Sequence, residues 1–253
     1  MLTLGDISTK NIVFYDPYVK DRCVDFCQRR AITLMPDLHD PHTIWRYNAE
    51  SRDFKASPTP PESIADAQTP VFNANLASRF AESPLLLIQD QNCTAGVVHF
   101  SDYNCDKIAI ACFSAFREWE RTARTLLNEL GFSDEDFARY LENHKNERWQ
   151  LIAPQYRLRS SSASSAFAHA DLLPFNAFLG GATGIKLKDS VTKIRNSVMH
   201  ARGLVLNDPD AEHDLIFDLE SFTTFFTCIQ ELMQSSRTLK NRLAIESENK
   251  YAA

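Results

Sequence analysis

The stretch AIACFSAFREWERTARTLLNELG, residues 109–131, indicates the fold class of the second half of the chain. Its apolar residues recur at alternating steps of three and four, which is the spacing of one buried face on a helix. They are Ala109, Cys112, Phe116, Trp119, Ala123, Leu126 and Leu130. Gly131 follows them, and glycine readily adopts the left-handed conformation that ends many helices. The stretch therefore predicts a long helix that packs in a bundle.

The segments after this helix continue the helical pattern. Ser133, with Glu135 and Asp136 in the first turn, forms a capping box that predicts a helix start in the segment 133–152. A serine-rich loop, a short helix with a proline and a long final helix are expected at 160–165, at 167–180 and from about 222 onward. We expect residues 104–253 to form an all-α, up-and-down bundle of about five helices.

The first half of the chain mixes short β-type runs with helices and turns. Strands or strand ends are expected at residues 11–17, 31–38 and 43–48, and a short amphipathic helix at 18–30. The runs PLLLIQD and AGVVHF, at 84–90 and 95–100, are joined by a short polar turn and predict a β-hairpin. The chain is therefore predicted to be α+β, with a smaller α/β domain over residues 1–103.

Composition limits the class of protein. Of the 253 residues 44% are hydrophobic, as in folded proteins, and the net charge of −6 argues against a general coat for nucleic acid. No apolar run reaches the roughly 18 residues of a membrane span, and the N-terminus MLTLGDISTK lacks the basic and apolar regions of a signal peptide. We expect a cytoplasmic protein without a membrane partner, whose six cysteines are free thiols.

A second stretch, SVTKIRNSVMHARG at residues 190–203, carries the side chains with the most chemistry. Its core-facing side is marked by Val191, Ile194, Val198 and Ala201. At about 100° per residue, Asn196 and His200 point away from that side, and Arg195 lies at its edge. His200 also lies in the last turn, where the helix dipole favours a protonated imidazole. The helix thus offers a cation, an amide and a titratable group.

Basic residues surround this motif. Between residues 186 and 202 the chain has five basic residues and one acidic residue, Asp189. The basic ones are Lys186, Lys188, Lys193, Arg195 and Arg202. All of them except Arg195 are candidate RNA-binding residues, and the alternative is an ordinary solvated helix face.

Residues from about 105 to 245 resemble the HEPN superfamily, the higher eukaryotes and prokaryotes nucleotide-binding domains. That family is a helical bundle whose hallmark is an arginine, usually followed by a polar residue, and then a histidine after four to six residues. Arg195, Asn196 and His200 fit this pattern, on the penultimate helix where the family places it. The resemblance implies a metal-independent endoribonuclease with these three catalytic residues, and a homodimer that brings two motifs into one cleft.

These residue types suit metal-independent RNA cleavage. RNA can be cut by attack of its own 2′-hydroxyl on phosphorus, which requires proton transfers, whereas DNA lacks that hydroxyl. An imidazole such as that of His200 titrates near neutrality, and the guanidinium of Arg195 can hold two phosphate oxygens. The two residues lie about 140° apart around one helix. A second copy of the motif, supplied by a dimer, would therefore help to complete the site.

A structural alternative stays open for each of the three residues. Arg195 then only pairs with an acid such as Asp189 or Glu220. Asn196 only caps a loop, and His200 only interacts with the last carbonyls of its helix. Because Arg195 and His200 lie off the core-facing side, truncating either one is expected to cost at most about 1 kcal/mol of stability.

The segment PLLLIQDQNCTAGVVHFSDYN, residues 84–104, resembles the second copy in a pair of cystathionine-β-synthase (CBS) domains. It ends in a form of the family's Gly-h-h-Thr-x-x-Asp pattern, in which Gly96 and Asp102 fit and His99 replaces the threonine. The resemblance implies a regulatory adenine nucleotide bound near Gly96, His99 and Asp102. In the alternative, Asp102 and Ser101 cap the helix that follows.

The pair His39 and His42, in LHDPH, is the remaining candidate for metal chemistry. No third ligand is visible near it in the sequence, so we interpret the segment as a turn and expect no metal site.

Two functional hypotheses follow. The first is an endoribonuclease that requires no cofactor and is regulated by its N-terminal domain. The second is a non-catalytic regulatory or scaffold protein that senses a nucleotide and dimerises through its helical bundle. RNA cleavage that depends on His200 separates the two.

Overall fold

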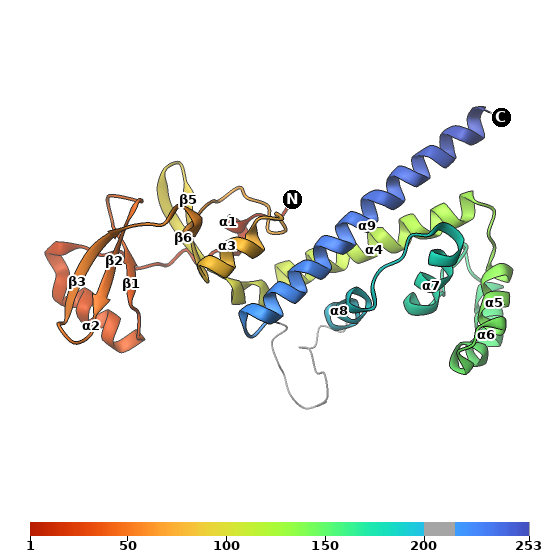
Figure 1. Cartoon of the computed structure of the whole chain (residues 1–253), viewed down its shortest axis with the longest axis horizontal. Helices are drawn as coiled ribbons and strands as arrows, with labels where there is room; N and C mark the ends of the chain where they lie inside the picture. The colour runs from red at the N-terminus through yellow and green to blue at the C-terminus, as the bar shows by residue number, and fades with distance from the viewer. Residues whose placement is uncertain (200–215, 253) are drawn as a thin grey trace. The chain divides into compact units, whose positions relative to one another are not determined.

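A computed structural model describes residues 1–199 and 216–252, without the side chains at 196, 197, 199, 251 and 252. These residues form two compact units (Figure 1), one made of 1–108 with 216–226 and the other of 109–199 with 227–252. The helices α4 (Asp106–Glu129) and α9 (Leu219–Ala252) each begin in the first unit and continue in the second. The sequence-based division at residue 103 places the start of α9 in the helical half, whereas the structure assigns it to the first unit.

The first unit contains an antiparallel sheet in the order β1 (Leu34–Pro36), β2 (Thr43–Asn48) and β3 (Asp53–Pro58). Helix α2 (Lys20–Arg30) packs against it through Cys23, Val24 and Cys27, which lie on one helix face and are buried. Sheet residues Met35, Tyr47 and Phe54 complete this core, together with Tyr15. Cys23 and Cys27 therefore serve as small core side chains, and all six cysteines of the chain are free.

The β1–β2 connection contains His39 and His42 and is a turn, as predicted. Asp37 Oδ1 accepts hydrogen bonds from the backbone N–H groups of His39 at 2.7 Å and Asp40 at 2.8 Å. Asp40 Oδ1 accepts one from the His42 N–H at 2.9 Å. Within 1–199 and 216–252, no three His, Cys, Asp or Glu residues are grouped so that they could hold a metal.

A second sheet in the same unit has the order β4 (Ile64–Asp66), β5 (Leu85–Asp90) and β6 (Cys93–His99). Strand β4 is parallel to β5 and is connected to it through α3 (Leu76–Glu82), whereas β5 and β6 form the predicted antiparallel hairpin. Its two-residue turn, Gln91 and Asn92, has φ values of 48° and 62°. Positive φ at both positions matches the right-handed twist of the paired strands.

The aromatic core beneath the second sheet explains why the start of α9 belongs to this unit. Tyr103 and Phe80 each pack edge-to-face on Phe222 of α9, with ring centroids 5.1 and 5.0 Å away. The Tyr103 hydroxyl donates to the Val71 carbonyl at 2.7 Å, and burial raises the pKa of this phenol above its usual value. Asn104 exchanges two hydrogen bonds with the backbone of Ile216, at 2.6 and 2.9 Å.

The second unit is all-α over its described residues. It contains most of α4 and α9 and, between them in sequence, α5 (Asp134–Asn143), α6 (Glu147–Ser160), α7 (Leu172–Thr183) and α8 (Asp189–Met199). The predicted segment 133–152 divides into α5 and α6, because the Asn146 side chain accepts from the Arg148 N–H at 3.0 Å and starts a new helix. The predicted capping box at α5 is present, with the Ser133 N–H 2.9 Å from Asp136 Oδ2.

The long helix predicted from residues 109–131 is confirmed. Cys112, Phe116, Trp119, Ala123 and Leu126 are fully buried along one face of α4. Burial raises the pKa of Cys112 to about 12, so its thiol stays protonated at neutral pH. No helix within the described residues is both long enough and apolar enough to cross a membrane.

Helices α4 and α9 run in the same direction within the second unit. Trp119 Nε1 donates to Ser235 Oγ at 2.9 Å, and further along both helices Glu129 pairs with Lys250 at 2.6 Å. The described residues of this unit form six helices, α4 to α9, where the sequence predicted about five.

Candidate functional site

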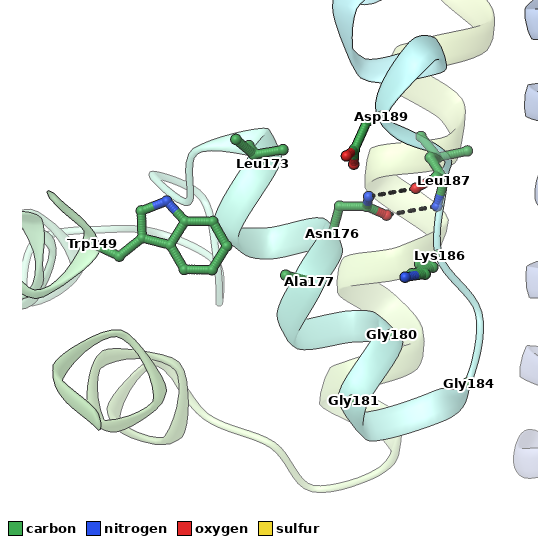
Figure 2. A pocket seen from close by; sticks show the side chains of 10 residues that line it. All are labelled: Trp149, Leu173, Asn176, Ala177, Gly180, Gly181, Gly184, Lys186, Leu187 and Asp189. Carbon is green, nitrogen blue, oxygen red and sulfur yellow. Dashed lines mark hydrogen bonds between the residues drawn. The ribbon is translucent and has the colours of Figure 1, made fainter. Parts of the chain in front are cut away.

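The entrance to α8 is fixed by a buried asparagine on α7. Asn176, only 4% exposed, accepts from the Leu187 N–H at 2.7 Å and donates from its Nδ2 to the Leu187 carbonyl at 2.9 Å (Figure 2). One side chain thus satisfies both backbone groups of a buried residue, two positions before α8 begins. Asn176 sets where α8 starts, a role that sequence reasoning missed because it needs the tertiary contact.

Helix α8 faces the core as its spacing predicts. Val191 and Ile194 are buried, and Val198 is half-buried, whereas Ala201 lies outside the described residues. The packing of this face fixes how α8 is rotated about its axis. It places Arg195 at the edge of the buried surface, as expected from the sequence.

Arg195 meets two charged residues of α4. Its Nη2 lies 3.1 Å from Oε1 of Glu120, and Oε2 of the same carboxylate accepts from Nη2 of Arg124 at 3.2 Å. The Arg195 and Glu120 side chains are 22% and 13% exposed, so solvent screens this pair only weakly. The trio carries two positive charges and one negative charge, which leaves an excess of one positive charge.

Arg124 adds to the cationic character of this cluster. Its guanidinium lies over the Phe175 ring at 5.8 Å, and its buried Nε has no hydrogen-bond partner among the described residues. A buried donor without an acceptor is costly. The cluster of Arg195, Glu120 and Arg124 therefore has both charge and hydrogen-bonding capacity for an anion.

Glu120 is a residue of the candidate site that sequence reasoning missed. The sequence suggested Asp189 or Glu220 as partners for Arg195, and neither forms a recorded ion pair with it in the described residues. The sequence does contain a pattern that could have indicated Glu120. Glu120 and Arg124 are four residues apart on α4, a spacing that predicts an ion pair, and they lie next to the buried positions Trp119 and Ala123.

The other two motif residues cannot be placed beside Arg195. Asn196 lies within α8, but its side chain is outside the description, and His200 lies outside the described residues altogether. Their roles stay predictions from the sequence.

The basic residues around the motif differ in their surroundings. Lys188 forms an ion pair with Glu231 of α9, so part of the local positive charge is offset from another helix. Lys186 lies against Gly180, where an added Cβ would come within 3.1 Å of the lysine Cβ. Lys193 is exposed, and Arg202 lies outside the described residues. A charge count along the sequence overestimates this patch because it ignores Glu120 and Glu231.

A hollow of about 470 Å³ lies beside the start of α8 (Figure 2). Its walls include the indole of Trp149, the backbone at Gly180 and Gly181, and the charged side chains of Lys186 and Asp189. This volume is in the range of small-ligand sites. An aromatic face beside a cation and a carboxylate can stack a flat ring and bond to its polar edge.

The predicted nucleotide-binding residues, Gly96 and His99 of β6 and Asp102 of the 3₁₀ helix that follows it, make local contacts. An added Cβ at Gly96 would lie 2.8 Å from the Thr9 carbonyl oxygen, since Thr9 and Val97 exchange backbone hydrogen bonds at 2.9 and 3.1 Å. Asp102 accepts from the His99 N–H at 2.8 Å, and His99 Nδ1 accepts from the Ser101 N–H at 3.2 Å. Both contacts cap the 3₁₀ helix Phe100–Asn104, with His99 as the N-cap residue and Asp102 in the first turn, whereas the predicted cap placed Asp102 and Ser101 ahead of the helix.

Gly96→Ala is expected to lower the free energy of unfolding by about 1–3 kcal/mol, because the new methyl group meets a backbone carbonyl that cannot move away cheaply. Gly181→Ala is the matched control. Nothing lies within 4 Å of an added Cβ there, so it should stabilise α7 by roughly 0.5–1 kcal/mol. Urea denaturation of both variants measures the difference. Equal stabilities would show that Gly96 is not needed for close packing.

No protein-family model, curated protein or solved structure matches this chain.

Proposed function

We propose that this protein is a metal-independent endoribonuclease whose site is built on α8. The observation that carries the proposal is the half-buried cluster in which Arg195 and Arg124 share the single carboxylate of Glu120. A phosphodiester carries negative charge and would accept hydrogen bonds from a guanidinium fork. The resemblance of the Arg195, Asn196, His200 pattern to the HEPN superfamily adds the chemistry to this binding capacity.

The proposed reaction uses the RNA 2′-hydroxyl as its own nucleophile. His200 takes the proton of that hydroxyl, the oxygen bonds to phosphorus, and the bond from phosphorus to the 5′ oxygen breaks. The 5′ oxygen leaves with a proton from a second acid. Arg195 offsets the charge that develops on the non-bridging oxygens. The products are a 2′,3′-cyclic phosphate and a 5′-hydroxyl.

The hollow beside α8 supports an RNA substrate. A base that has left the stack would pack on Trp149, while the Lys186 ammonium would favour the neighbouring phosphate. Only single-stranded RNA presents bases in this way, so we propose unpaired loops or ends as the substrate class.

A homodimer remains part of the proposal. Arg195 and His200 lie five residues apart, which separates them by about 140° around a helix. On a helix that continues to His200 the two side chains would point in different directions, and two copies would let Arg195 of one protomer serve with His200 of the other.

The topology of the first unit supports a regulatory role of the CBS type. Tyr15 pairs in parallel with Asp37 just after β1, and α2 connects the two paired segments, as α3 connects the parallel strands β4 and β5. In each half, an antiparallel hairpin follows the helix. This repeated path is what a tandem pair of sensor domains would have.

The pairing of Arg195 with Glu120 also favours the second candidate, a non-catalytic scaffold. An ion pair between packed helices explains a half-buried arginine without any substrate. In that case α8 only stabilises the bundle, and the protein acts through its first unit.

Incubation of the full chain with a mixed RNA pool and with DNA of matched sequences separates the two candidates. The ribonuclease should cut the RNA to the same extent with and without EDTA, and should leave the DNA intact. Adenine nucleotides are added in a parallel set, because a regulated enzyme can need its effector. RNA that stays intact in every condition would support the scaffold.

A further inference from the structure

A cavity of about 700 Å³ lies in the first unit, between its two sheets. Strands β1 and β2 contribute to one side and β5 and β6 to the other, and residues 11–13 and 31–33 form part of the remaining wall. The volume is that of a site for a small organic molecule. None of the side chains proposed for RNA cleavage lines it.

Most of the wall is apolar. Ile12, Val13, Ile32, Leu34, Leu87 and Val97 are among its lining side chains. Val13 and Leu34 are 42% and 40% exposed, although both are large hydrophobic residues. A bound apolar group would remove this surface from water, which is the main driving force for ligand binding in such cavities.

The ionisable side chains of the wall are an arginine and a histidine, and no Asp or Glu lines the cavity. Arg46, on β2, forms no ion pair within the described residues, and it lies directly opposite Lys55 in the sheet register. Like charges that face each other across two strands are destabilising unless an anion relieves them. Positive charge at this edge of the cavity is therefore not neutralised by the protein.

The imidazole of His99 offers a second donor. Its Nδ1 accepts a hydrogen bond from the Ser101 N–H at 3.2 Å. The same nitrogen lies 2.8 Å from Ser101 Oγ, and in the neutral tautomer in which Nδ1 accepts, Nε2 carries the proton and can donate. Arg46 and His99 thus supply charged or titratable hydrogen-bond donors to a mainly apolar cavity.

We propose that this cavity binds an apolar anion, a molecule with a hydrophobic body and one carboxylate or comparable acidic group. The hydrophobic body of the ligand packs against the apolar wall, and its acidic group accepts hydrogen bonds from Arg46 and His99. An adenine nucleotide fits less well, because Asp102, one of the residues predicted to lie beside it, is already bonded to the His99 N–H. The proposal does not depend on ribonuclease activity.

The full chain can be titrated with the fluorescent aromatic sulfonate 1-anilinonaphthalene-8-sulfonate, which is itself an apolar anion. Decanoate should displace the dye at about a tenfold lower concentration than decanol, which has the same chain without the charge. Adenosine monophosphate should not displace it. The proposal would be overturned if decanol displaced the dye at the same concentration as decanoate, or if the nucleotide alone displaced it.

Variants locate the site. Arg46→Gln should raise the decanoate concentration for half-displacement about tenfold and leave that for decanol unchanged, whereas Arg30→Gln, an exposed arginine outside the cavity, should change neither. Leu34→Glu places a repelling charge in the wall and should abolish displacement by decanoate, with Leu34→Gln as its neutral control. Melting curves verify that each variant is folded. Decanoate binding that is unchanged in both Arg46→Gln and Leu34→Glu would show that the anion binds elsewhere.

Discussion

Arg195→Ala is expected to slow metal-independent RNA cleavage by at least about 10²-fold, because it removes the group that offsets charge on the phosphate in the transition state. The structure adds a cost that the sequence did not predict. Without Arg195, the remaining ion pair of half-buried Glu120 within the described residues is the one with Arg124. We therefore expect a loss of about 1–3 kcal/mol of stability, instead of the 1 kcal/mol or less expected for an exposed side chain.

Two further substitutions separate the catalytic role from the structural role. Glu120→Gln removes the charge that holds Arg195 but retains the shape, and it should lower stability more than it lowers the rate of cleavage. Arg121→Ala, an exposed arginine of α4 outside the cluster, is the matched control and should change neither. Cleavage is measured as the single-turnover rate at saturating protein, with melting temperatures recorded on the same samples. If the cleavage rate of Arg195→Ala falls only in proportion to its folded fraction, Arg195 has a structural role and no catalytic one.

The loss of Asn176 should have the largest effect on stability. Asn176→Ala leaves the buried N–H and carbonyl of Leu187 without partners, and each unsatisfied group costs about 1–3 kcal/mol. We expect the free energy of unfolding to fall by about 2–4 kcal/mol in total. Because Asn176 fixes the entrance to α8, RNA cleavage should also fall at temperatures where the variant is still folded.

Asn176→Asp tests the same contact more finely. At neutral pH an aspartate still accepts from the Leu187 N–H but places a buried charge against the Leu187 carbonyl oxygen, so Asn176→Asp should be no more stable than Asn176→Ala. Asn128→Ala, at an exposed position of α4, is the control and should stay within about 0.5 kcal/mol of the wild type. Urea denaturation gives all the values. If the Asn176→Ala protein is as stable as the Asn128→Ala protein, the hydrogen bonds of Asn176 to Leu187 do not stabilise the fold.

The helices were predictable because one face of each is buried. The stripe through Phe116 and Trp119 has a period that only a helix gives, and both side chains are fully buried in α4. The β5–β6 hairpin was predictable for a similar reason, since two apolar runs flank a short polar turn. Strands β3 and β4 were missed because β3 buries only Phe54 and β4 has three residues, so neither shows an alternating pattern.

The contacts of the candidate site were less predictable than its residues. The sequence places Arg195 at the edge of the core face of α8, and the structure agrees. It does not reveal Glu120, which lies 75 residues earlier and meets Arg195 only when α4 and α8 pack. The same holds for Asn176 and Leu187, which are separated by a loop. The spacing of apolar residues identifies which face of a helix or strand is buried. The residue that a side chain contacts on a neighbouring element depends on how the two elements pack.

The central claim is that the α8 motif cleaves RNA through its own 2′-hydroxyl. Mass spectrometry of the fragment ends, after incubation of RNA with the full chain in EDTA, tests it most directly. The account predicts 2′,3′-cyclic phosphate and 5′-hydroxyl ends from the wild type, and a yield at least about 10²-fold lower from His200→Ala. Fragments with 3′-hydroxyl and 5′-phosphate ends, or equal yields from the two proteins, would contradict it.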